Sequence, residues 1–163
     1  MALVTQDEII NTMNVDDHLS VNNISNSTIT KAELYIANTF LGEGFYNAMA
    51  GVKTSTGTFS NSNIQFFYDN YLLRLISEYV LTICLNDIIL KVANKGIENT
   101  NQVDVYGVSK AAYQDEFERS KVMADAYLIK NKSSVIFGNY LGNDIDSTTD
   151  KIIAKTAYGF FIE

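Results

Sequence analysis

The stretch from residue 63 to residue 94 constrains the fold more than any other part of the chain. Read as one helix, it has roughly 30 residues and a length of about 45 Å at 1.5 Å per residue. Between Tyr79 and Leu90 the residues are apolar on nearly every helical face, which predicts burial on most sides. The other elements must therefore pack around this central helix. The core residues expected on it are Leu81, Cys84, Leu85 and Ile88.

This central stretch is not expected to cross a membrane. Its most apolar part contains Arg74, Glu78 and Asp87, and a membrane span of about 20 residues rarely carries three charges. The N-terminal residues MALVTQDEII lack the basic region and the long apolar region of a signal peptide. We therefore expect no membrane segment and no membrane partner.

Start and stop patterns divide the rest of the chain into further helices. Two T-x-x-E capping boxes, Thr5 with Glu8 and Thr30 with Glu33, predict helices over 5–14 and 30–41. Glycines are expected to end several helices, because a helix end often needs a left-handed residue. The expected helix-terminating glycines include Gly42 and Gly96, and shorter or later helices are expected over 45–50, stopping at Gly51, 109–130 and 134–141.

The remaining segments complete the predicted architecture. Residues 16–28 are rich in Asn and Ser and are expected to form a connector. Residues 53–60 and 97–108 are predicted to pair as a small β-hairpin, since Val103, Val105 and Val108 suggest alternation. The sequence thus predicts a mainly α protein: a helical bundle around one long buried central helix in a single domain, 1–146, and an extended C-terminal arm, 147–163. The absence of proline agrees with a helix-rich chain.

Charge and cysteine content exclude several classes of function. The net charge is -7, and no segment is a basic patch, so sequence-independent binding to nucleic acid lacks its usual electrostatic source. An acidic chain can still line a DNA channel, because like charges let the backbone slide. The single cysteine, Cys84, cannot form an intrachain disulfide or build a zinc site alone.

No catalytic constellation is visible. The only histidine, His18, lies in the polar sequence Asp16-Asp17-His18, and we interpret it as a solvated loop residue rather than a metal ligand or general base. Cys84 has no cation one turn away that would lower its pKa, so we expect a core residue rather than a nucleophile.

Two motifs resemble binding loops only in part. The acidic loop from Asp144 to Asp150 begins D-x-D-x-T, but as a calcium loop it lacks a glycine at its sixth position and a glutamate at its twelfth. The sequence Gly42-Glu43-Gly44 lacks the third glycine of a nucleotide-binding loop. We therefore expect no cofactor, no metal and no enzymatic activity, while cation binding by the acidic loop stays open.

The C-terminal arm carries an unusual density of apolar residues beyond the last expected helix. An apolar arm left in water promotes aggregation, so it must be covered. It either packs back on its own domain or docks on a neighbouring subunit, for example as a donated strand. The candidate interface residues are Ile152, Ile153, Tyr158, Phe160, Phe161 and Ile162.

Three stretches resemble the small head–tail connector proteins of tailed bacteriophages, particularly those of Bacteroidetes-infecting and crAss-like phages. Residues 37–46, ANTFLGEGFY, are similar to a helix followed by Leu-Gly and then Phe-Tyr in that family. The helix ending Ala-Asn-Lys-Gly-Ile at 93–97 resembles one that ends in Asn-Lys-Gly. The segment with Ala124 and Tyr127 that leads to 140–141 resembles the closing helices. The resemblance covers about residues 28–142.

The resemblance implies a structural virion protein, without catalysis, at the head–tail junction. It implies a helical adaptor subunit, assembled in the host cytoplasm, that forms a homo-oligomeric ring, often twelvefold, below the portal. The partners implied are the portal protein, the next tail or neck ring protein, and DNA passing through the channel. Phe45 and Tyr46 of the matched stretch are expected to pack against the central helix. The arm over 147–163 lies outside the matched region.

Two other functions remain as alternatives. A tail-completion or terminator protein would share the same features. A small acidic phage inhibitor of a host defence protein would mimic the charge of DNA, but such mimics carry denser arrays of acids on one face. The central helix here has only Asp69, Glu78 and Asp87.

Overall fold

The computed structural model describes residues 3–13, 24–54, 57–94, 100–133 and 137, with side chains left undescribed at 91–94 and 100–106. The described part is mainly α-helical, as the sequence predicts. Its elements are α1 (Gln6–Met13), α2 (Asn26–Ile36), the π-helical turn η2 (Ala37–Leu41), α3 (Glu43–Val52), α4 (Ser62–Phe67), the π-helical turn η3 (Tyr68–Leu72), α5 (Leu73–Asn94) and α6 (Thr100–Lys130).

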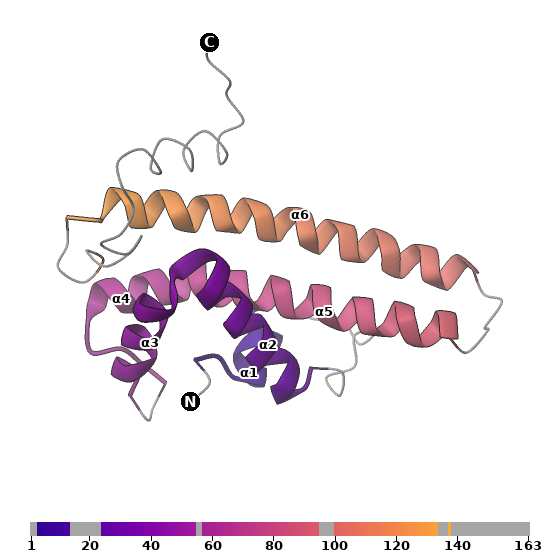
Figure 1. Ribbon diagram of the computed structural model, residues 1–163, viewed down its shortest axis with the longest axis horizontal. Coiled ribbons are helices and arrows are strands. Elements are labelled where there is room, and N and C mark those ends of the chain that lie inside the picture. The colour runs from indigo at the N-terminus through magenta and orange to yellow at the C-terminus, as the bar shows by residue number, and fades with distance from the viewer. Residues whose placement is uncertain (1–2, 14–23, 55–56, 95–99, 134–136, 138–163) are drawn as a thin grey trace, which may run out of the picture.

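Helix α5 is the centre of the arrangement. It packs along its length against α6, while α1 and α2 lie on its other side (Figure 1). The two long helices are antiparallel, because Arg74 near the start of α5 reaches Glu116, whereas Asn86 farther along accepts a hydrogen bond from Lys110. Burial follows this placement: Leu75, Ile76, Val80 and Leu81 of α5 are buried.

The first capping box forms as predicted. The backbone N–H of Thr5 donates to the Glu8 carboxylate at 2.7 Å, and the N–H of Glu8 donates to the Thr5 hydroxyl at 3.3 Å. These reciprocal bonds satisfy N–H groups that the first turn of a helix leaves unpaired. They start α1 one residue after Thr5.

The second predicted capping box does not form. Helix α2 begins four residues earlier than expected, because Ser25 caps it and accepts a hydrogen bond from the N–H of Thr28. Thr30 is inside the helix and donates to the carbonyl of Asn26, while Glu33 binds a different part of the chain. Ser25 therefore caps α2 because it lies at the true helix start, and the cap that the spacing predicted at Thr30 is absent.

The predicted helix break at Gly42 is present. Gly42 has φ of 80° and ψ of 136°, a backbone conformation that side-chain-bearing residues rarely adopt, and it separates η2 from α3. Gly51, by contrast, is a helical residue of α3, so the predicted stop there is wrong. Gly96 lies outside the described residues.

The predicted central helix over 63–94 appears as α4, η3 and α5 in direct succession. The π-helical turn over 68–72 holds an extra residue compared with an α-helical turn. Phe67 before this turn and Leu72 at its end are both buried, so the inserted residue keeps apolar side chains on the core side.

The predicted β-hairpin is wrong within the described residues. A single antiparallel bridge joins Lys53 and Phe59, but residues 103–108 belong to α6. The β-branched valines favour strand only weakly, and a long partner helix overrides such a local preference. α6 therefore begins at Thr100, nine residues before the predicted start at 109.

Candidate functional site

A buried carboxylate on α2 holds the segment that precedes α1. Oε1 of Glu33 accepts hydrogen bonds from the backbone N–H groups of Leu3 and Val4, each at 2.7 Å. Leu3, Val4 and Glu33 are all buried, so these charge-assisted bonds form away from water. Glu33 thereby ties residues 3 and 4 to a helix about thirty positions later in the sequence.

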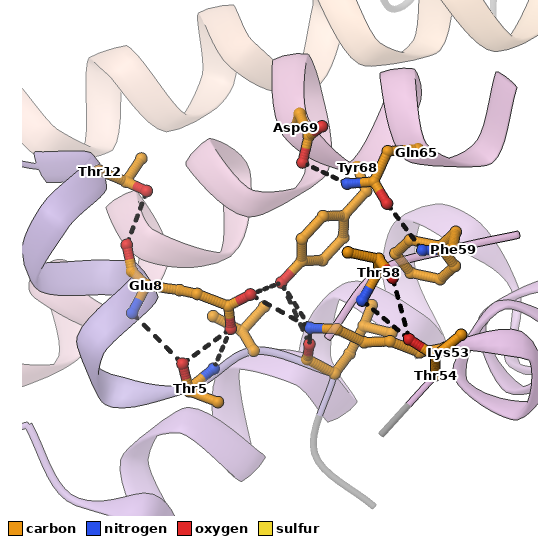
Figure 2. A network of polar contacts seen from close by, with 12 residues as sticks. Thr5, Glu8, Thr12, Lys53, Thr54, Thr58, Phe59, Gln65, Tyr68 and Asp69 are labelled. Carbon is orange, nitrogen blue, oxygen red and sulfur yellow. Dashed lines mark hydrogen bonds and ion pairs between the residues drawn. The ribbon is translucent and has the colours of Figure 1, made fainter. Parts of the chain in front are cut away.

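Lys53, at the end of α3, holds the other side of the same segment (Figure 2). Its ammonium group donates to the carbonyl of Leu3, lies 3.3 Å from Oε1 of Glu8, and lies 3.0 Å from the hydroxyl of Tyr68. The Tyr68 hydroxyl is in turn 3.0 Å from Glu8 and 3.2 Å from the Leu3 carbonyl oxygen. We call Leu3, Glu8, Glu33, Lys53 and Tyr68 the N-terminal clamp.

Burial and pairing shift the pKa values of the clamp in different directions. Burial raises the pKa of Glu33, and the N–H groups of Val4 and Leu3 offset only part of that effect. Burial also acts on Glu8, but hydrogen bonds from Thr5 and Tyr68 and the charge of Lys53 outweigh it and lower the pKa of Glu8. Burial, followed by the charge of Glu8, raises the pKa of the Tyr68 hydroxyl, so Tyr68 stays protonated.

The chemistry of this clamp is that of an anchor. The Lys53 side chain is 6% exposed, and its ammonium lies 4.5 Å from the centre of the Tyr68 ring, where the aromatic face adds cation–π attraction. Its polar partners are groups of the same chain. Among the residues described, no group of three His, Cys, Asp or Glu side chains is placed to hold a metal ion.

A second buried carboxylate lies between α5 and α6. The side chain of Glu78 is fully buried, and its Oε1 accepts a hydrogen bond from Nε of Arg74 at 2.7 Å. The guanidinium of Arg74 also contacts Glu116 of α6 at 3.1 Å. The other oxygen of Glu78 has no hydrogen-bond partner among the described residues. The hydrogen bond to Glu78 and the charge of Glu78 raise the pKa of Arg74, so its guanidinium stays protonated.

Aromatic rings join the end of α6 to α4 and η3. Tyr127 of α6 stacks on Phe67 with ring centres 5.8 Å apart and lies 4.9 Å from Tyr71. Phe137, beyond α6, is buried with its ring 5.9 Å from those of Phe67 and Tyr127 and 6.2 Å from that of Phe45. The chain after α6 therefore returns to the core at residue 137.

Beside this aromatic cluster lies an exposed apolar surface. On α6, Phe117, Ala124 and Leu128 are buried toward α5, whereas the opposite side of the helix exposes apolar residues one turn apart. Met123 is 52% exposed and Ile129 is 46% exposed. Phe66 of α4, 49% exposed, extends this surface because its ring lies 5.6 Å from that of Tyr127. We call the exposed set the apolar patch: Phe66, Val122, Met123, Ala126 and Ile129.

The structure places the predicted core residues as follows. Phe45 and Tyr46 are buried on α3, and Leu81, Cys84 and Leu85 are buried on α5. Ile88, farther along α5, is half-buried. His18, the acidic loop over 144–150 and the six candidate interface residues over 152–162 lie outside the described residues.

The sequence pattern did not reveal the N-terminal clamp or the apolar patch. Glu33 and Lys53 contact residues that are distant in sequence, and no local spacing predicts such a pairing. The patch was hidden because α6 is apolar on two sides, so its exposed apolar residues look like core residues in the sequence. One signal was available: Lys53 is the only cation between Lys31 and Arg74.

Comparison with known proteins adds nothing to these observations. No protein-family model, no curated protein and no solved structure matches the chain. In the described residues, no helix is both long enough and apolar enough to cross a membrane.

Proposed function

We propose that this chain is a structural subunit of a tailed-phage virion, a head–tail connector that assembles into a ring below the portal. The observation that carries the proposal is the apolar patch on α6 and α4. Monomeric proteins rarely leave a contiguous apolar surface of this kind uncovered, and its usual role is to bind another protein. The resemblance of residues 28–142 to phage connectors supplies the kind of assembly.

The packed pair of α5 and α6 suits a structural subunit of a larger particle. The two helices are held together by buried side chains, by the Arg74 bridge and by the Lys110–Asn86 hydrogen bond. The N-terminal clamp fixes the shorter helices to the same core. These features support a scaffold that presents surfaces to other subunits.

The charge pattern of α5 argues against a mimic of DNA. A mimic needs exposed carboxylates in a row, but Glu78 is buried and paired with Arg74. Of the acids on the central helix, only Asp69 and Asp87 are exposed. Two separated charges do not reproduce a phosphate backbone, and this favours the connector over the inhibitor.

The test is the particle mass of the purified protein, measured by light scattering alone and after mixing with the portal protein from the same genome. A ring-sized particle, or a ring-sized increase in the mass of the portal, is the expected result. A lone 18.2 kDa species that leaves the portal unchanged would overturn the proposal. Phe66→Asn is the matched variant, since it removes an exposed aromatic residue from the patch and should reduce assembly without unfolding the chain.

A further inference from the structure

We propose that the apolar patch is the docking site for the C-terminal arm of a neighbouring copy of this chain. This inference rests on the proposed ring and names the contact that would hold it together. The occupant is residues 152–163, which carry Ile152, Ile153, Tyr158, Phe160, Phe161 and Ile162. These residues lie outside the described part of the chain.

The chemistry of the arm complements that of the patch. The patch is apolar along two turns of α6, from Val122 to Ile129, and apolar side chains gain most by covering one another. The arm offers its densest apolar sequence at Phe160-Phe161-Ile162 and places the carboxylate of Glu163 directly after it. A surface that binds this arm should therefore be apolar and should end in a positive charge.

Positive charges lie where that carboxylate would arrive. Lys130 follows Ala126 by one helical turn, and Lys132 comes just after α6. Both are exposed, and neither forms an ion pair with a residue that the structure describes. An arm that lies along the patch toward the end of α6 would bring Glu163 to these lysines, which sets the direction of docking.

The connection to the arm is long enough to reach a neighbouring copy. Phe137 is buried against Phe67 and Tyr127, so the arm departs from a point beside its own patch. Residues 138–151 can extend over about 45 Å at roughly 3.3 Å per residue. A compact chain of this length is about 40 Å across, from a radius of gyration of about 15 Å. The connection can therefore span the distance to the next subunit.

Engineered cysteines test this contact in the full chain. One preparation carries Ile129→Cys, a second carries Phe161→Cys, and the two are mixed under mild oxidation. The natural Cys84 is buried and does not compete. Val108→Cys replaces Ile129→Cys in the control, because Val108 is also exposed on α6 but lies about four turns from the nearest patch residue, Val122. We expect about tenfold more disulfide-linked dimer with Ile129→Cys than with the control, since docking raises the effective concentration of the pair.

Two outcomes would overturn the inference. Equal crosslinking of the two mixtures would show that the arm has no preference for the patch. A chain carrying both Ile129→Cys and Phe161→Cys that crosslinks only within itself would show that the arm covers its own subunit. Light scattering on the same samples tests the ring proposal separately. Rings that form without the crosslink would exclude docking of the arm on the patch but not the ring. Crosslinked dimers that form no ring would exclude the ring but not docking of the arm.

A charge variant provides a second measurement that does not depend on cysteine chemistry. Met123→Glu places a carboxylate within the patch, whereas Val108→Glu places one elsewhere on the same helix. Both side chains are exposed, so both variants should keep the helical fold. Loss of the Phe161→Cys crosslink with Met123→Glu, and not with Val108→Glu, is the expected result; equal retention in both variants would exclude the patch as the docking site.

Discussion

Oε1 of Glu33 lies 2.7 Å from the backbone nitrogen of Leu3, a residue thirty positions earlier in the chain. The same oxygen also binds the N–H of Val4, so one buried carboxylate orients two consecutive peptide groups. A buried N–H group that loses its acceptor destabilises a fold by about 1–3 kcal/mol. The position of the segment before α1 is therefore set by α2.

Replacing Glu33 should separate its two contributions. Glu33→Ala leaves the N–H groups of Leu3 and Val4 without an acceptor and should lower the free energy of unfolding by about 2–4 kcal/mol. Glu33→Gln keeps an acceptor oxygen and removes a buried charge, so its effect should be no more than about half as large. Urea unfolding followed by circular dichroism measures both. Glu43→Ala, at an exposed position of α3, is the control; a loss as large as that of Glu33→Ala would contradict the anchoring role.

The two carboxylates of the N-terminal clamp should respond oppositely to acid. The pKa of Glu8 is lower in the folded chain than its ordinary value near 4.5, so its stabilising effect is present above pH 4.5 and is lost as the pH falls through the lowered value. The pKa of Glu33 is raised, so the folded state binds that proton more tightly, and acid stabilises it between the raised value and 4.5.

The measurement is the free energy of unfolding from pH 7 to pH 3 for the native chain, Glu8→Gln and Glu33→Gln. The advantage of the native chain over Glu8→Gln should shrink with falling pH. As the pH falls, the free energy of unfolding of the native chain relative to Glu33→Gln should rise over the upper part of the same range. Parallel curves for all three proteins would mean that neither pKa changes on folding.

The ion pairs of α5 and α6 predict that replacing Arg74 lowers the free energy of unfolding much more than replacing Arg119 does. Arg74→Met leaves Glu78 buried without a cation and should destabilise the fold by about 2 kcal/mol, less than the 3–5 kcal/mol of a fully buried pair because Arg74 is half exposed. Arg119 pairs with Glu116 at the surface, so Arg119→Met should change stability by about 0.5 kcal/mol or less. Thermal or urea unfolding compares the two.

A double variant checks the origin of that loss. In Arg74→Met combined with Glu78→Met, no buried charge remains, and most of the lost stability should return. If the double variant is less stable than Arg74→Met alone, the penalty does not come from an unpaired carboxylate.

The start of α2 gives a prediction that contrasts two neighbouring hydroxyl residues. Ser25→Ala removes the side chain that accepts from the N–H of Thr28, and it should lower the free energy of unfolding by about 1 kcal/mol. Thr30→Ala removes a hydroxyl that only bonds back to the carbonyl of Asn26, so stability should change little. A larger loss of stability for Thr30→Ala than for Ser25→Ala in urea unfolding would indicate that Thr30, and not Ser25, caps the helix.

Periodic and local patterns predicted much of the fold. The central helix, the capping box at Thr5 and the break at Gly42 each depend on residues within a few positions of one another, and all three are present. The predicted cap at Thr30 failed because Ser25 competes for the same role. The predicted strand over 103–108 failed because the long partner helix α5 decides the conformation of that segment.

The candidate sites were less predictable, because they depend on contacts between distant residues. Glu33 meets Leu3, and Lys53 meets Glu8, only after three helices have packed on one another. The apolar patch requires knowing which side of α6 faces α5. Val122 and Ala124 have similar hydrophobic character in the sequence, yet one is exposed and the other is fully buried.

The π-helical turn at residues 68–72 has a consequence for how the aromatic surface is encoded. The wider turn absorbs one extra residue, so removing a residue there, such as Asn70, would restore an ordinary α-helical turn without rotating α4 relative to α5. Phe67 would therefore keep its orientation toward Phe137. The π-helical turn thus lets this helix contain one more residue than an α-helix of the same rotation, while the aromatic rings on either side of the turn stay in register.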